Sequence, residues 1–128
     1  MKTKKYQADE ERAVLTGMIV NDGVLDVIAR NLKGDKAPFR SKWSNLIARW
    51  CLEHWEKYKE APGKGINQLF SRFAQKSRDE DIVGLVETFL QGLNDDFNSL
   101  AEEMNSQFII DTASRFFNAV RYERLVKK

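Results

Sequence analysis

The feature that most constrains the fold is an apolar stripe at helical spacing in the middle of the chain. From about Ser41 to Lys59, apolar and aromatic residues recur at steps of three and four: Trp43, Leu46, Ile47, Trp50, Cys51, His54 and Tyr58. These steps place side chains on one face of an α-helix. Similar spacing recurs along most of the chain, whereas strand-like alternation and hairpin signals between β-branched runs are missing. The sequence therefore predicts an all-α protein.

Turn and capping residues divide the chain into helices. We expect a first helix from Asp9 to about Val20 and a second one capped by Asp22 and ended by Gly34. A fourth helix, after the central one, begins near Ile66.

Capping residues also mark the last two long helices. Ser77 with Glu80 has the form of a capping box and opens a fifth helix to about Leu93. The run 94–96 (Asn-Asp-Asp) is expected to break that helix, and the stretch up to Met104 is expected to hold one helical turn at most. Asn105 or Ser106 then caps a last helix that still has helical spacing at the end of the sequence.

The length of 128 residues is that of one domain. We expect a compact head of about four helices followed by a C-terminal helical hairpin. Residues 1–8, with three lysines, are expected to form a flexible basic arm, and residues 9–128 a single helical domain.

Charge and cysteine content narrow the functional classes. The net charge is only +2, and basic residues concentrate at the two ends, which argues for weak or no direct DNA binding. One cysteine, Cys51, allows no internal disulfide and favours a reducing compartment. No apolar run follows the N-terminal lysines, and none is long enough to cross a membrane. We expect a cytoplasmic protein.

Three patterns resemble catalytic or metal sites without meeting their requirements. Gly63-Lys64-Gly65 lacks the preceding glycine and the following Ser or Thr of a phosphate-binding loop, so a turn between helices is expected. Cys51 and His54 share a helical face, but zinc would need further ligands and the chain has no other Cys or His, so a packed Cys and a hydrogen-bonded His in the core are expected. The acidic residues 79–81 suit a helix N-terminus. We therefore expect no enzyme activity, cofactor or metal in this chain.

The tryptophans allow two interpretations. Trp43 and Trp50 lie on the central stripe and are expected in the core. Trp55 and Leu52 fall off it, either as a base-stacking platform or as packing under a neighbouring helix or a partner. No basic run is interleaved with these rings, so packing is favoured.

The last two long helices carry more apolar residues than one packed face explains. Phe108, Ile110, Tyr122, Leu125 and Val126 lie outside the regular stripe of the last helix. The surplus either covers the domain's own first helices or contacts a partner. We assign self-association to six residues of the regular stripes of these two helices: Leu85, Phe89, Ile109, Phe116, Phe117 and Val120. We therefore expect Phe117→Asp to keep the chain helical and to dissociate a dimer.

Several segments, taken in order, resemble the N-terminal domain of DnaB-type replicative helicases, especially the divergent ones of phages and mobile elements. The resemblance runs from about Asp9 to Leu125. It is carried by Glu11–Ile19 (ERAVLTGMI), Asp26–Ile28, Phe39, Ile47, Ala61–Phe70, Asp111–Phe117 and Arg124–Leu125.

This resemblance implies a helical head with a hairpin that pairs between subunits into a ring collar. Such a collar supports hexamer formation and docks primase or other replisome proteins, while the ATPase lies in a following domain. We therefore expect a non-catalytic assembly domain. The alternatives are a stand-alone helical adaptor or regulator of a replication protein, and a small nucleic-acid-binding module that uses the basic ends.

Overall fold

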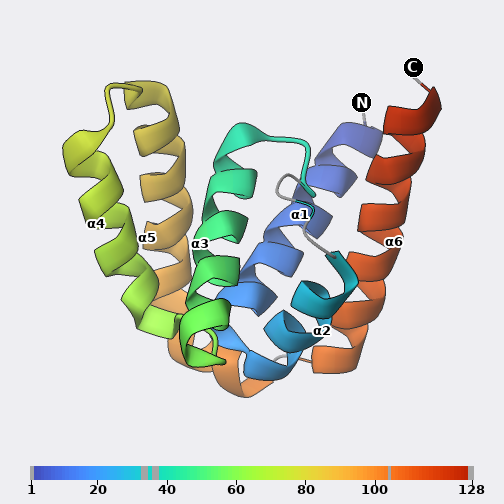
Figure 1. Cartoon of the computed structure of the whole chain (residues 1–128), viewed down its shortest axis with the longest axis horizontal. Coiled ribbons are helices and arrows are strands. Elements are labelled where there is room, and N and C mark those ends of the chain that lie inside the picture. The colour runs from blue at the N-terminus through green and yellow to red at the C-terminus, as the bar shows by residue number, and fades with distance from the viewer. Residues whose placement is uncertain (1, 33–34, 36–37, 104, 127–128) are drawn as a thin grey trace.

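A computed structural model describes residues 2–32, 35, 38–103 and 105–126 of the chain. All its regular elements are helices, which confirms the predicted fold class (Figure 1). The elements are α1 (Lys2–Val20), α2 (Asp22–Leu32), α3 (Lys42–Tyr58), the 3-10 turn η1 (Gly63–Gly65), α4 (Ile66–Lys76), α5 (Glu80–Glu103) and α6 (Ser106–Val126).

Helix α1 is the centre of the arrangement. It packs against α6 and α2 on one side and against α3 and α5 on the other (Figure 1). Helix α4 lies at the far edge, where it contacts α5, α3 and η1. The first helix of the chain is thus enclosed by elements from the rest of the sequence.

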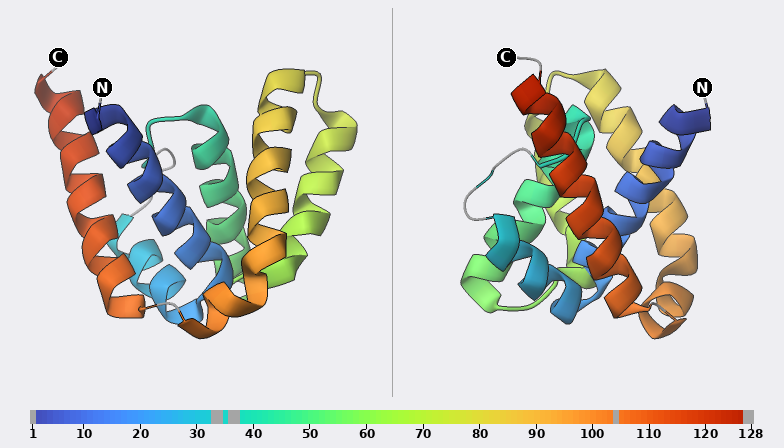
Figure 2. Two further views of the ribbon diagram at one scale, coloured as in Figure 1. Left: turned by 180° about the vertical axis from the view of Figure 1, so that it is seen from behind. Right: turned by 90° about the vertical axis from the view of Figure 1, so that its right-hand side faces the viewer.

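The C-terminal hairpin is open. Helices α5 and α6 follow each other in sequence but stand apart, with α6 at one edge of the molecule, α5 beside α4 toward the other edge, and α1 between them (Figure 2). Their main contacts are with other helices: α6 packs on α1 and α2, and α5 packs on α3, α1 and α4. The inner faces of both helices therefore pack against other helices of the same chain.

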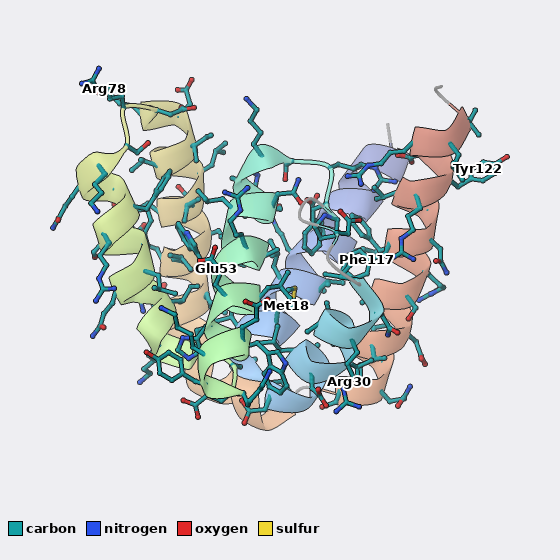
Figure 3. The ribbon with its side chains drawn as sticks, viewed as in Figure 1. Met18, Arg30, Glu53, Arg78, Phe117 and Tyr122 are labelled. Carbon is teal, nitrogen blue, oxygen red and sulfur yellow. The ribbon has the colours of Figure 1, made fainter. Side chains whose placement is uncertain are left out.

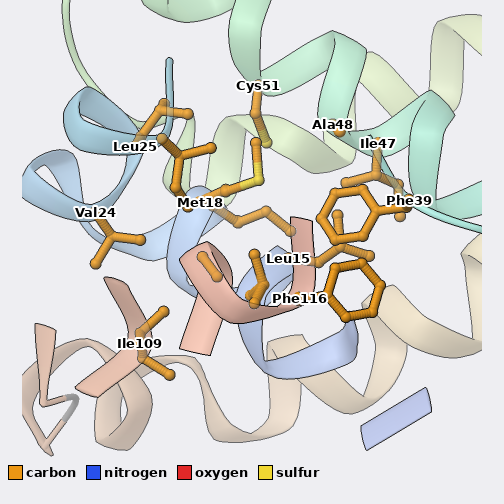
Figure 4. Close-up of a cluster of buried hydrophobic side chains, with 14 of the residues drawn as sticks. Leu15, Met18, Val24, Leu25, Phe39, Ile47, Ala48, Cys51, Ile109 and Phe116 are labelled. Atoms are coloured by element: carbon orange, nitrogen blue, oxygen red, sulfur yellow. The ribbon is translucent and has the colours of Figure 1, made fainter. Parts of the chain in front are cut away.

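The core forms where α1 meets its neighbours. Leu15 and Met18 of α1 are completely buried, and Cys51 of α3 points toward Met18 (Figure 4). Each fully buried side chain of this size contributes roughly 1.5–3 kcal/mol. Phe39, which precedes α3, packs edge-on against Phe117 of α6, with ring centroids 5.4 Å apart.

A buried polar contact fixes the start of α3 against α1. The Ser41 hydroxyl donates to Oε1 of Glu11 at 2.9 Å, and Ser44, which is fully buried, shares a 2.7 Å hydrogen bond with Ser41. Because Glu11 is only 8% exposed, its carboxylate accepts the hydrogen bond from Ser41 almost out of contact with water. The pairing sets how α3 enters the core.

The caps of two helices differ from the predicted ones by a residue or two. Asn21, rather than Asp22, caps α2, since its Oδ1 accepts the amide N–H of Val24 at 3.0 Å. Asp79, rather than Ser77, caps α5 by accepting the N–H of Ile82 at 3.1 Å. Asn105 caps α6, as one of the two predicted options.

Two predicted boundaries were wrong. Helix α1 begins at Lys2, ahead of the expected start at Asp9, so the backbone of residues 2–8 continues the helix. Helix α5 runs to Glu103 without a break at 94–96. The polar residues Asn94 and Asp95 lie on the exposed side of a helix that buries Leu93, and a helix tolerates such residues when no Gly or Pro intervenes.

Candidate functional site

Four of the six residues predicted to mediate self-association belong to the core of a single chain. Ile109, Phe116, Phe117 and Val120 are each at most 9% exposed, on the inner face of α6. This face packs on α1 and α2, so these side chains cover the chain's own first helices.

The other two predicted residues lie on α5. The ring of Phe89 is half-buried and packs against Trp43 of α3, with centroids 5.4 Å apart. Leu85 is 52% exposed. Of the six, only Leu85 presents more than half of its surface to solvent, and it does not lie beside the α6 residues.

The outer face of α6 carries the apolar residues that the core leaves out. Phe108, Tyr122, Leu125 and Val126 are 60–70% exposed. Tyr122 points away from the body of the molecule at its edge, whereas Phe117 of the same helix points inward (Figure 3). The sequence pattern placed these four residues outside the regular stripe, and this irregular position was the signal of an exposed contact surface. They were not among the six residues predicted to mediate self-association.

The helix end that carries Tyr122 and Leu125 is held firmly to the body. Arg40, just before α3, donates two hydrogen bonds to the Glu123 carboxylate, at 2.6 and 3.1 Å. Its guanidinium also lies over the Phe116 ring, 5.0 Å from the centroid. Arg124 pairs with Asp35 at 3.7 Å. These contacts fix the direction in which the exposed apolar side chains project.

A groove of about 780 Å³ runs between α2 and α3. Its apolar lining residues are Ala29 and Leu32 of α2 and Leu52 and Trp55 of α3. Charged residues line it as well: Arg30, Arg49, Glu53 and Glu56. We call this feature the α2–α3 groove. It lies within the size range of pockets that hold a small ligand or a few side chains.

A smaller groove, of about 290 Å³, lies between α3 and α4. The rings of His54 and Tyr58 pack there at a tilt of 45°, with centroids 4.6 Å apart, and Trp50 packs against Phe73 of α4 at 5.5 Å. His54 is half-buried at the surface, whereas the sequence predicted a position in the core.

The tryptophans are all partly buried and pack against the core. Trp43 and Trp50 lie less deep than predicted, because the most buried line of α3 runs through Ile47 and Cys51. Trp55 lines the α2–α3 groove, and the Lys59 ammonium lies 5.9 Å from its ring centroid.

Cys51 is a core residue, as predicted. It is completely buried, and burial alone raises the pKa of its thiol far above the usual range. A thiol held neutral in this way is a poor nucleophile and a poor metal ligand. Within the described ranges, no group of three or more His, Cys, Asp or Glu residues is placed to hold a metal ion.

The other two motifs singled out in the sequence have structural roles. Gly63-Lys64-Gly65 forms the one-turn helix η1 between α3 and α4, as predicted, and Gly63 takes a positive φ of 55°, which favours glycine. Glu80 and Asp81 lie in the first turn of α5, where carboxylates interact favourably with the helix dipole. Among the helices described, none combines the length and apolarity needed to cross a membrane.

Comparisons with protein-family models, with curated proteins and with solved structures find no match to this chain. Its function is therefore inferred from its own surfaces. On the outer face of α6, four large apolar side chains project into solvent from a single well-held helix.

Proposed function

We propose that this chain is a non-catalytic assembly domain that binds another protein through the outer face of α6. The proposed assembly is the collar of a DnaB-type replicative helicase. In such a collar the domain supports oligomerisation and docks primase or another replisome protein. The resemblance of Glu11–Ile19 and Asp111–Phe117 to that family supports this choice of assembly.

One observation carries the proposal. Tyr122, Leu125 and Val126 are 69%, 70% and 66% exposed within the last five residues of α6, although the opposite face of the same helix completes the core. Single exposed apolar residues are common on monomeric proteins, but a local cluster of large ones typically marks a contact surface.

The free energy available is that of apolar burial. Covering this surface yields roughly 25 cal/mol per Å² of apolar area removed from water. The loss of translational and rotational freedom, at least about 4 kcal/mol, must be subtracted. An interface built on three side chains is therefore expected to be of moderate affinity on its own and to gain strength where several copies assemble.

The experiment measures the mass of the chain in solution over a wide concentration range. Light scattering or sedimentation is expected to give masses above the 14.8 kDa of one chain. The double variant Tyr122→Ser/Leu125→Ser should return the mass to that of a monomer. Tyr58→Ser is the matched control, because Tyr58 is 62% exposed but lies on α3.

Two results separate the proposal from its alternatives. A monomer that binds a purified primase or helicase loader through Tyr122 and Leu125 would favour the adaptor or regulator. A chain that stays monomeric and binds no replication protein, with or without the substitutions, would contradict an assembly role.

A further inference from the structure

We propose that the α2–α3 groove is the receptor for the exposed end of α6 from a second copy of this chain. We call Tyr122, Leu125 and Val126 the α6 knob. The inference rests on the proposed function, namely that the outer face of α6 associates, and adds which surface of the partner copy it meets. One chain would then carry both halves of a head-to-tail interface.

The groove offers a surface that suits a short apolar helix end. Leu52 and Trp55 are half-buried, and each presents the accessible part of its side chain to the floor of the groove, beside Ala29 and the buried Leu32. Helices α2 and α3, which line the groove, already pack on each other and form a rigid surface. Docking therefore costs little conformational entropy on this side of the interface. Apolar side chains entering this floor would displace water from apolar surface on both partners.

The charges around the groove favour a basic partner. Arg30 is neutralised by Asp26, whose carboxylate accepts its Nε–H at 2.9 Å. Glu53, Glu56 and Arg49 are exposed and form no ion pair with any other described residue. The unpaired charges at the groove are therefore two acids and one base.

The knob supplies the matching chemistry. Its residues follow the i, i+3, i+4 spacing that gathers side chains on one helical face. Arg121 stands beside it in the last two turns of α6, Arg124 is there as well but already pairs with Asp35, and two lysines follow in the sequence. An apolar cluster flanked by basic residues complements an apolar floor with surplus acidic charge.

Knob and groove cannot meet within one chain. Tyr122 lies at the upper edge of the molecule, whereas Glu53 of α3 and Arg30 of α2 lie on the front and lower part (Figure 3). The hydrogen bonds between Arg40 and Glu123 hold the end of α6 in this place. Docking into a second copy leaves one free knob and one free groove on each pair, and such an interface closes into a ring or extends as a filament.

Pairing of two α6 helices with each other is less suitable. Phe108 is separated from Tyr122 by fourteen positions, about 21 Å along the helix. Between them the outer face presents the exposed polar side chains of Asp111, Arg115 and Asn118. A two-fold contact along α6 would bury these groups together with the apolar ones, and burying charge without a partner is costly.

The test uses knob, groove and control variants of the whole chain. The knob variant is Tyr122→Ser/Leu125→Ser, and the groove variant is Glu53→Lys/Glu56→Lys, which changes only exposed side chains. Ala29→Arg, which fills the floor, serves as a second groove variant. Glu60→Lys/Glu87→Lys is the control, because it changes the net charge equally at exposed positions outside this groove. Circular dichroism verifies that each variant keeps its helicity.

Each variant alone is expected to be monomeric, with self-association weakened at least about tenfold, while the control assembles like the parent chain. An equimolar mixture of knob and groove variants should form pairs of two chains and nothing larger, because the intact knob of one fits the intact groove of the other.

Three outcomes would overturn the inference in distinguishable ways. Both groove variants assembling like the parent chain would exclude the groove and leave association through α6 intact. A mixture that stays monomeric, like each variant alone, would indicate a two-fold contact in which every copy needs both its own knob and its own groove. A parent chain that is monomeric at every concentration would remove self-association altogether.

Discussion

Asn67 and Asn94 exchange two hydrogen bonds through their side-chain amides. Asn67 Nδ2 donates to Asn94 Oδ1, and Asn94 Nδ2 donates to Asn67 Oδ1, each at 3.0 Å. The pair joins the first turn of α4 to the middle of α5, and the Asn67 amide also donates to the Lys64 carbonyl at 3.1 Å. Asn94 thus bonds outward from a helix that the sequence predicted to end there.

A double-mutant cycle should detect this pair. Asn67→Ala and Asn94→Ala each remove both reciprocal bonds, so the double variant should lose less stability than the sum of the single ones. Because the pair is exposed, a coupling of about 0.5–1 kcal/mol is expected. Urea unfolding gives the four free energies. Strictly additive free energies would mean that the two side-chain amides hydrogen-bond to water in solution and are not coupled to each other.

Phe117→Asp should unfold the chain instead of dissociating an assembly, contrary to the expectation from sequence. Phe117 is 5% exposed and packs on Phe39 and Phe116. Loss of a buried Phe alone costs about 3–5 kcal/mol, and a buried carboxylate adds more. A typical domain has only about 5–15 kcal/mol of stability.

The helical signal in circular dichroism and its thermal midpoint report this loss. Leu85→Asp is the control, because Leu85 is 52% exposed and its replacement should change stability by less than about 1 kcal/mol. A cooperative, fully helical Phe117→Asp monomer would contradict the packing described for α6.

Lys59→Gly should stabilise the chain. Lys59 ends α3 in the left-handed region, with φ 56° and its N–H bonded to the Trp55 carbonyl at 2.9 Å. A side chain in this conformation costs about 1–2 kcal/mol, which glycine avoids, while its freer unfolded chain offsets part of the gain. A rise of about 0.5–1 kcal/mol in the free energy of unfolding follows. Lys59→Ala keeps the strained backbone and should show no such rise.

Glu11→Ala should weaken the contact between α1 and α3. The substitution leaves the Ser41 hydroxyl, which also hydrogen-bonds to the buried Ser44, without its carboxylate acceptor in a partly buried place. A buried polar group deprived of its partner costs about 1–3 kcal/mol. Chemical denaturation measures the loss, and Glu10→Ala, at a less buried neighbour, gives the reference. Equal effects at both positions would show that the network contributes nothing specific.

The buried thiol of Cys51 should make stability depend on alkaline pH. Burial raises its pKa in the folded state, so the folded chain keeps the proton that the unfolded chain loses above about pH 8.5. Stability contributed in this way is intact below that pH. Above it the free energy of unfolding falls by up to about 1.4 kcal/mol per pH unit.

Other groups also titrate at high pH, so the variant Cys51→Ala is measured in parallel between pH 8 and 9.5. The difference in slope belongs to the thiol. In addition, iodoacetamide should modify Cys51 in urea but not in the native chain. Rapid native modification would show that the side chain is reached by solvent.

Much of the fold was predictable because apolar spacing directly reflects burial. The regular stripe of α3 correctly located a helix with Ile47 and Cys51 in the core. The stripe could not show how far the helix turns toward each neighbour, so Trp43 and Trp50 are only half-buried and Tyr58 is exposed. Rotation of a helix depends on the neighbours that pack on it, which a local pattern does not contain.

The contact surface was harder to predict for a related reason. The regular positions of α6, such as Phe116 and Val120, were assigned to a partner, although regular spacing is what a core-facing helix needs. The irregular positions, Tyr122 and Leu125, are the ones that remain exposed. Only the knowledge that α1 and α2 cover the regular face separates these two sets.

The central place of α1 has a consequence for how the chain folds as it is synthesised. Its apolar side chains leave the ribosome before those of α6, one of the helices that cover them. Contacts between such distant segments slow folding compared with a bundle of sequential neighbours. The nascent chain therefore keeps α1 only partly covered until α6 has been made, so chaperones that bind such segments have time to act on it.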